Sequence, residues 1–184
     1  MSDARVFTRT VHVHDLPGIP VGPRISQVLD DITCEGRWAR VVQGLHECGW
    51  TDYFQQAFAS YWITAGHHIR HQIGDDRRLA EILRKVLPPY AGEALLLYRG
   101  ENAAALEAGR VGFAWTPLRD VAEMFGRGLN AEPGGGVLLV GRFAPRDILS
   151  GPNRHSRHLG ELQYTVDPCA YAAIEVVDRY PAPI

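Results

Sequence analysis

Arg99 follows Ala94–Tyr98, an apolar stretch of strand length, and is itself followed by Gly100. A guanidinium at the end of a buried strand can present a planar pair of donors to a phosphate or a carboxylate. The other role open to such a residue is a buried ion pair with a carboxylate of the core. Its position therefore makes Arg99 a candidate anion-binding group, with the core ion pair as the competing interpretation.

Two later segments could supply the rest of a site. Trp115 and Thr116 stand directly before Pro117, where the ring could equally pack in the core and the hydroxyl could cap the following helix. Glu161 and Gln163 are expected to open a strand, in which residues two apart share one face. The same two side chains could instead form the exposed face of an edge strand.

A metal site is not expected. His67 and His71 lie one helical turn apart, a spacing that can bind zinc. A zinc protease would have glutamate directly after the first histidine, where this chain has His68, and no third ligand is evident. Gly134–Gly136 precedes a strand, whereas phosphate-binding glycine loops stand between a strand and a helix. We expect a surface helix at the histidines and a flexible turn at the glycines.

The composition is that of an ordinary globular protein, with 46% of the 184 residues hydrophobic and 22% charged. A net charge of -2 gives no overall basic field to attract nucleic acid or a membrane, and no apolar run approaches the length of a membrane span. The odd number of cysteines, 3, has no paired spacing and is typical of a reducing compartment. Because the N-terminus lacks a signal-peptide pattern, we expect a cytoplasmic protein, or one delivered into a target cell without a cleaved leader.

The first half of the chain is predicted to be helical. From about residue 24 to residue 87, apolar residues recur at helical spacing, and Thr51 and either Asp75 or Asp76 can cap two of the helices. Pro88–Pro89 ends this pattern, because proline cannot continue a helix. Residues 1–89 are therefore interpreted as an N-terminal arm and a helical segment.

The second half, residues 90–184, is predicted to combine short strands with small inserted helices. The predicted strands are residues 94–98, 111–116, 137–143, 163–166 and 173–177. The predicted helices are residues 102–108 and 117–125, the second with Pro117 at its first position. Residues 151–160 are predicted to be a polar loop. Helices followed by a mostly antiparallel sheet make the fold class α+β.

The order of these segments resembles that of the arginine–serine–glutamate type of ADP-ribosyltransferase, a family of enzymes that cleave NAD at the nicotinamide bond. Tyr98-Arg99-Gly100 is similar to the first block of that family, and Phe113–Phe125 is similar to the second. Glu161-Leu162-Gln163, leading to Val166-Asp167-Pro168, resembles the third block, an acidic strand. The resemblance covers about residues 94–178 and implies a split β-sandwich. The matching offsets in the second block are those of Thr116, Ala122 and Phe125.

The resemblance implies a mono-ADP-ribosyltransferase of bacterial toxin or effector type, with NAD as donor substrate and no metal. Arg99 would hold an NAD phosphate and the nicotinamide ribose, and Thr116 would support the site. Loop 151–160 would face an unidentified macromolecular acceptor, a protein or a nucleic acid. An immunity or antitoxin protein could neutralise the activity. The remaining NAD-binding positions would be Tyr98, Gly100, Trp115 and Phe125.

Two positions depart from the family pattern. Ala114 stands where the second block begins with serine, and Gln163 stands where the third block has its catalytic glutamate. Three explanations stay open: Glu161 serves instead, the chain is a weak or inactive member, or the glutamine is a deliberate replacement. The alternatives to a transferase are a non-catalytic ADP-ribosyltransferase-like binding module and an NAD glycohydrolase. In the family arrangement, Arg99 lies on a strand next to the one that carries residues 161 and 163.

Overall fold

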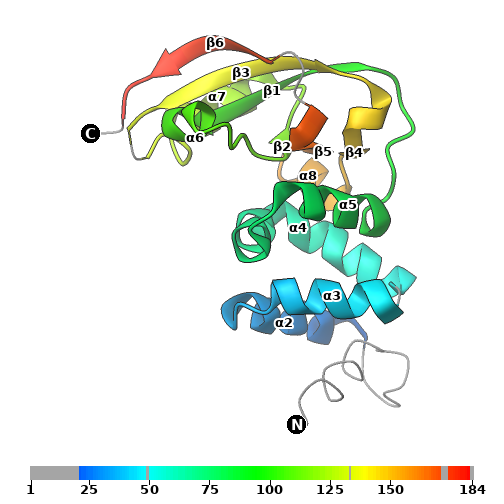
Figure 1. Cartoon of the computed structure of the whole chain (residues 1–184). Helices are drawn as coiled ribbons and strands as arrows, with labels where there is room; N and C mark the ends of the chain where they lie inside the picture. Colours follow the sequence, from blue (N-terminus) through cyan, green and yellow to red (C-terminus); the bar gives the residue numbers. More distant parts are fainter. Residues whose placement is uncertain (1–20, 49, 133, 171–173, 183–184) are drawn as a thin grey trace. The chain divides into compact units, whose positions relative to one another are not determined.

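The computed structural model describes residues 21–48, 50–132, 134–170 and 174–182, without the side chains of residues 21–24 and 45–48. The chain forms two compact units, Met1–Leu87 and Pro88–Ile184 (Figure 1). Most of the arm expected before residue 24 lies outside the described residues. Among the described residues, no helix has both the length and the apolar character that crossing a membrane requires.

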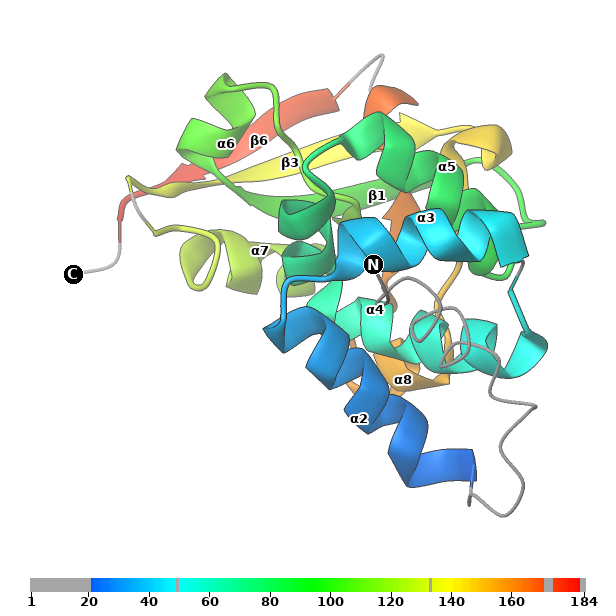
Figure 2. The same cartoon turned by 60° about the horizontal axis from the view of Figure 1, so that its bottom comes forward.

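The first unit is helical, as the apolar periodicity predicts (Figure 2). Thr51 caps the third of its described helices by accepting a hydrogen bond from the backbone N–H of Phe54 at 3.2 Å. Asp75, rather than Asp76, caps the fourth by accepting from the N–H of Arg78 at 3.0 Å. Both predicted caps are confirmed, since a side-chain oxygen satisfies an N–H that has no partner within the helix. The helices are α2 (Val21–Cys34), α3 (Trp38–Cys48), α4 (Asp52–Ile73) and α5 (Asp76–Val86).

Helix α4 is the centre of this unit and contacts α2, α3 and α5. Its aromatic residues stack one turn apart, with ring centroids 6.0 Å apart for Phe54 and Phe58 and 6.4 Å for Phe58 and Trp62. Trp38 of α3 is fully buried and meets Phe58 edge-on. These aromatic side chains therefore form the core of the helical unit.

The described part of the second unit forms two antiparallel three-stranded sheets, so the α+β class is confirmed at that level. The first sheet has the order β1-β3-β6, and the second has the order β2-β5-β4. An isolated antiparallel bridge between Tyr98 and Thr116 joins the two sheets. The strands are β1 (Leu95–Asn102), β2 (Ala114–Trp115), β3 (Gly136–Phe143), β4 (Ile148–Ser150), β5 (Tyr164–Val166) and β6 (Ile174–Tyr180).

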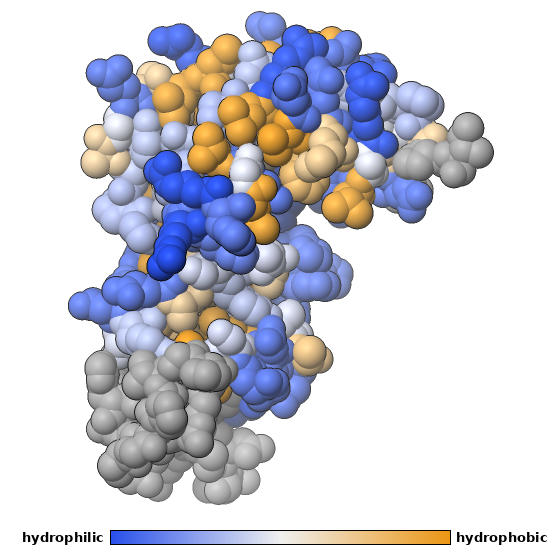
Figure 3. Space-filling model, turned by 180° about the vertical axis from the view of Figure 1, so that it is seen from behind, coloured by the Kyte–Doolittle hydropathy of each residue, from blue (hydrophilic) through white to orange (hydrophobic). Residues whose placement is uncertain are grey.

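Within its described residues this unit also has three short α-helices, α6 (Ala103–Glu107), α7 (Arg119–Arg127) and α8 (Arg154–His158). Two 3₁₀ turns, Pro145–Asp147 and Pro168–Ala170, lie between its strands. Helix α7 packs on β1 and β3. Figure 3 shows apolar side chains gathered over this unit beside strongly hydrophilic ones. Its exposed large apolar residues are Leu96, Leu118, Met124, Leu129, Leu159, Val176 and Val177. The core of the unit is formed by Leu97, Val111, Trp115, Val137, Leu139, Phe143, Ile148 and Val166.

The structure corrects the ends of several predicted elements. The helix expected to begin at Pro117 begins at Arg119, because the hydroxyl of Thr116 accepts from the N–H of Leu118 at 3.1 Å and forms a turn before the helix. The strand predicted for residues 111–116 is reduced to β2. The polar loop predicted for residues 151–160 contains α8, which Asn153 caps through the N–H of Ser156.

Candidate functional site

Arg99 and Glu101 lie two residues apart on β1 and therefore on one face of it. Nε of Arg99 donates to Oε2 of Glu101 at 2.7 Å. The two side chains are 13% and 7% exposed, so this is a nearly buried ion pair. At its Nε edge, Arg99 therefore forms the ion pair with a core carboxylate that was the competing interpretation.

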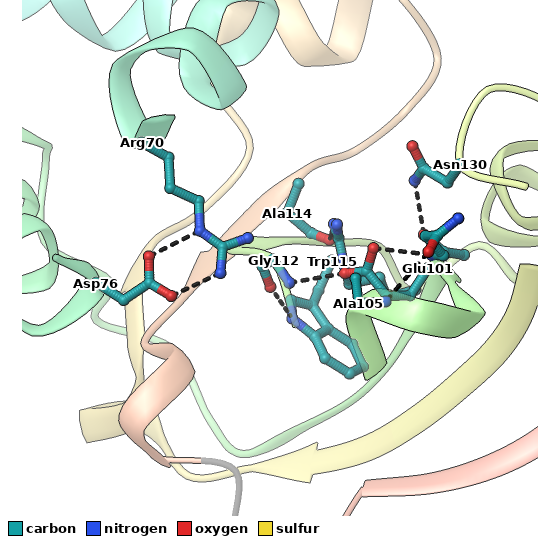
Figure 4. A network of polar contacts seen from close by, with 11 residues as sticks. Arg70, Asp76, Glu101, Ala105, Gly112, Ala114, Trp115 and Asn130 are labelled. Atoms are coloured by element: carbon teal, nitrogen blue, oxygen red, sulfur yellow. Dashed lines mark hydrogen bonds and ion pairs between the residues drawn. The ribbon is translucent and has the colours of Figure 1, made fainter. Parts of the chain in front are cut away.

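Glu101 also accepts hydrogen bonds from two backbone N–H groups, one on its own strand and one in the turn that leads into β2. Its Oε1 accepts from the N–H of Asn102 at 2.9 Å. Its Oε2 accepts from the N–H of Gly112 at 2.8 Å, as Figure 4 shows. Burial raises the pKa of this carboxyl, but the charge and hydrogen bond of Arg99 and the two N–H groups outweigh burial and hold the pKa below its usual range. Glu101 is therefore ionised at neutral pH.

The guanidinium of Arg99 also reaches the second sheet. Nη1 of Arg99 donates to the carbonyl oxygen of Ala114 on β2 at 2.7 Å. One residue along, the indole N–H of Trp115 donates to the carbonyl of Gly112 at 3.2 Å, and its ring meets Phe143 edge-on at 4.8 Å between centroids. Trp115 is only 1% exposed. Trp115 is therefore a core residue in this structure, and its ring presents no open face to a ligand.

Tyr98 and Gly100 alternate with Arg99 along β1 and so face the other side of the strand. A Cβ on Gly100 would overlap the backbone of α7 at Ala122 and Gly126, which explains why glycine follows Arg99. Phe125, on the same helix, is half-buried. Of the predicted NAD-binding residues, Arg99 therefore lies on one face of β1, and Tyr98 and Gly100 lie on the other. Gly100 allows the backbone of α7 to pack closely on the strand.

Thr116 connects the two sheets and is buried. Its backbone N–H donates to the carbonyl of Tyr98 at 2.9 Å and its carbonyl accepts from the N–H of Tyr98 at 2.7 Å. On the other edge of β2, Ala114 pairs with Thr165 and Trp115 with Tyr164. Continuing this register by one pair would set Thr116 opposite Gln163. The strands therefore lie in the order β1, β2, β5, with β2 between Arg99 and the segment of residue 163. The expectation that the strand of Arg99 lies directly beside the segment of residues 161 and 163 is thus wrong.

Glu161 and Gln163 lie just before β5, which begins at Tyr164. Leu162 between them has a φ of 44°, in the left-handed region. The expectation that residues 161 and 163 share a strand face is therefore wrong, because a residue in this conformation breaks the alternation of an extended strand. The N–H groups of Glu161 and Leu162 both donate to the carbonyl of Ser156, at 3.0 and 3.3 Å.

This turn follows directly on α8, whose side chains are mostly basic. Partial burial raises the pKa of Glu161, and the nearby His155 opposes that shift. Ser156, at the centre of the turn, is fully buried. Glu161 is thus held beside a histidine in a compact loop, while Arg154, Arg157 and His158 are exposed.

Sequence reasoning missed Glu101 and Gly112. The signal for Glu101 was its spacing, since two charged residues at i and i+2 on an apolar strand must face the same side and can pair. Gly112 carried no such signal, because its contact with Arg99 depends on the turn between α6 and β2. Among the described residues no group of three potential metal ligands exists, and His67 and His71 lie on α4. Gly134 and Gly135 have positive φ angles, which fits the predicted turn.

Comparison of the chain with protein-family models, with curated proteins and with solved structures finds no match.

Proposed function

We propose that the chain is a mono-ADP-ribosyltransferase of toxin or effector type that takes ADP-ribose from NAD. The observation that carries the proposal is the order of backbone pairings in the second unit. Tyr98 of β1 pairs with Thr116 beside β2, and Ala114 of β2 pairs with Thr165 of β5. The three segments that resemble the family's three blocks are thus neighbours, although they lie far apart in sequence.

In this proposal Arg99 binds an anionic oxygen of NAD. Its Nε and Nη1 groups are engaged with Glu101 and Ala114, which fixes the plane of the guanidinium. A fixed planar donor is suited to a phosphate oxygen, because little side-chain entropy is lost on binding. Thr116 supports the site through its backbone contacts to β1.

The reaction breaks the glycosidic bond between nicotinamide and ribose, and nicotinamide leaves with the bonding electron pair. A nucleophile of the acceptor then bonds to the anomeric carbon and loses its proton. A carboxylate beside the ribose stabilises the positive charge that develops in the transition state. Gln163 can still accept a hydrogen bond from a ribose hydroxyl but lacks the charge, so this chain would turn over NAD slowly unless Glu161 supplies the carboxylate.

The acceptor would meet the loop of residues 151–160. Its basic side chains would suit an anionic macromolecule, whether protein or nucleic acid. A neutralising immunity or antitoxin protein would then bind over the same loop or over Arg99. If water takes the place of the acceptor, the same bond cleavage makes the chain an NAD glycohydrolase.

A second function is favoured by the ion pair itself. Because Glu101 balances the charge of Arg99, and because Gln163 and Ala114 replace the family's glutamate and serine, the unit could recognise a nucleotide or a protein without turnover. Such a binding module would bind NAD and release no nicotinamide.

Replacing Gln163 with glutamate tests these functions. Gln163→Glu should raise the rate of nicotinamide release from NAD by about a hundredfold, the scale of one charge in a preorganised site. The matched control is Gln56→Glu, an exposed position of α4, which should not change the rate. Nicotinamide release is measured by chromatography, and label transfer from NAD to lysate macromolecules separates a transferase from a glycohydrolase.

Glu161→Ala decides which residue is the carboxylate. If residue 163 is the catalytic position, Glu161→Ala should alter label transfer more than nicotinamide release. If Glu161 is itself the carboxylate, its loss should abolish nicotinamide release and Gln163→Glu should add little. Folded variants that all release no nicotinamide would contradict the enzyme and leave the binding module.

A further inference from the structure

The carboxylate of Glu101 joins two separate segments of the second unit. It accepts hydrogen bonds from Nε of Arg99, from the N–H of Asn102 and from the N–H of Gly112. Asn102 continues β1, whereas Gly112 belongs to the turn that leads into β2. Three donors converge on one nearly buried side chain, so its position and that of Arg99 are set together.

The remaining donors of Arg99 define where a ligand can approach. Nε and Nη1 have partners, while Nη2 has no hydrogen-bond partner among the residues that the structure describes. The Arg99 side chain is 13% exposed, and Nη2 is not one of the fully buried, partnerless side-chain nitrogens of the described residues, so this atom reaches solvent. Nη2 lies against Gly112, since a Cβ on that glycine would overlap it. The ligand edge of Arg99 is therefore the Nη2 edge, beside a residue without a side chain.

We propose that Glu101 and Gly112 are positioning residues that fix Arg99 so that its Nη2 edge is presented to an anionic oxygen of the ligand. Glu101 holds the opposite edge of the guanidinium, and Gly112 leaves the space that Nη2 occupies. The inference rests on the proposed function in taking that oxygen to be a phosphate oxygen of NAD. Neither residue touches the ligand, and both act through Arg99.

The sign of one measurement separates positioning from simple charge attraction. Glu101→Gln removes a negative charge beside Arg99, so charge alone would make NAD bind more tightly. An amide, however, offers one acceptor oxygen and places an N–H₂ group where the carboxylate accepted a donor. The guanidinium or the turn at Gly112 must then shift. Positioning therefore predicts weaker binding in spite of the more favourable charge.

The affinity for NAD is measured by calorimetric titration on the full chain. We expect Glu101→Gln to weaken binding about tenfold to a hundredfold, the scale of the loss when the hydrogen-bond partner of a metal-binding side chain is removed. Gly112→Ala should weaken it to a similar degree. The matched controls are Glu107→Gln on the exposed face of α6 and Gly44→Ala, where a Cβ meets nothing within 4 Å. Equal or tighter binding by Glu101→Gln overturns the proposal.

A second measurement, made without NAD, tests the positioning role independently of the proposed function. In chain labelled with ¹⁵N-arginine, the Nε–H signal of Arg99, assigned by its loss in Arg99→Lys, should show slow exchange and low mobility. In Glu101→Gln it should become mobile, and an unchanged signal overturns the positioning role. If the unsubstituted chain does not bind NAD, the proposed function fails while this signal still decides the inference. Should Glu101→Gln not fold, Glu101→Asp, which keeps the charge but shortens the side chain, replaces it with the same expectation.

Discussion

At the scale of single residues, the ionised pair of Arg99 and Glu101 makes stability depend on pH. The folded-state pKa of Glu101 lies below its ordinary value, so folding favours the ionised carboxylate. This contribution is complete above the ordinary, unfolded-state pKa and is lost as the pH falls through the depressed folded-state pKa. Loss of Glu101 also leaves the positive charge of Arg99 nearly buried and without its ion partner.

We therefore expect Glu101→Gln to lower the free energy of unfolding by about 3 kcal/mol at neutral pH. The gap between this variant and the unsubstituted chain should narrow as the pH falls through the folded-state pKa, because both then carry a neutral side chain. Urea unfolding followed by circular dichroism at several pH values measures the gap. A gap that stays constant down to acidic pH would show that the charge of Glu101 does not stabilise the fold.

The role of a charged residue on an apolar strand was only half predictable from the sequence. The sequence predicts a strand that ends at Arg99, whereas β1 continues through Arg99 to Asn102. The choice between a ligand and a core carboxylate depends on what faces the guanidinium. Glu101 lies on the same face, and strand alternation alone could have identified it. Gln163 and Glu161 could not be placed correctly, because the left-handed conformation of Leu162 carries no sequence signal in a leucine.

At the scale of elements, α7 and the first sheet meet through glycine backbone. A Cβ on Gly100 would overlap the carbonyl of Ala122 and the N–H of Gly126, and a Cβ on Gly136 would overlap the carbonyl of Gly126. Backbone atoms cannot move aside as a side chain rotamer can. The contact therefore requires glycine at both sheet positions, Gly100 and Gly136, and holds the helix at a fixed distance from β1 and β3.

We predict that Gly100→Ala lowers the free energy of unfolding by about 2 kcal/mol or more, because the added methyl group must push α7 away from the sheet. Gly44→Ala in α3 should be neutral or slightly stabilising, since alanine favours a helix by up to about 1 kcal/mol over glycine. Chemical denaturation of the two variants measures the difference. Equal stability of both variants would mean that α7 adjusts without cost.

Some elements could be predicted from the sequence and others could not, and the difference depends on how each element is stabilised. The strands β1 and β3 were found from continuous apolar runs. Strand β3 is largely buried within the unit, whereas most positions of β1 are half-buried or exposed. Helix α8 was missed because its residues Arg154–His158 form no apolar stripe and its start is fixed by the side chain of Asn153. The start of α7 was misplaced because Thr116 forms its own turn before Leu118.

At the scale of the whole molecule, each of the two units has a core of its own. The helical unit is built around Phe58 and Trp38, and the mixed unit around Trp115 and Leu139. The α+β class followed from the change of pattern at Pro88–Pro89. The pairing of β2 with β5 did not, because the register between distant strands is set by burial of their faces and not by local spacing.

Residues 88–184 alone should fold, because the strands and the core of the second unit lie within that range. The fragment should unfold cooperatively on heating and give dispersed amide signals in a nitrogen–proton correlation spectrum. A spectrum confined to the random-coil range would show that the helical unit is required for the second unit to fold.

The distribution of tryptophan between the two units has an optical consequence. Of the 4 tryptophans in the chain, Trp38, Trp50 and Trp62 belong to the helical unit, and Trp115 is in the second. The indole N–H of Trp115 is bonded to the carbonyl of Gly112, the residue against Nη2 of Arg99. With the other three replaced by phenylalanine, the emission of Trp115 would report solely on the second unit. Its wavelength would then follow events at the Arg99 turn without any attached dye.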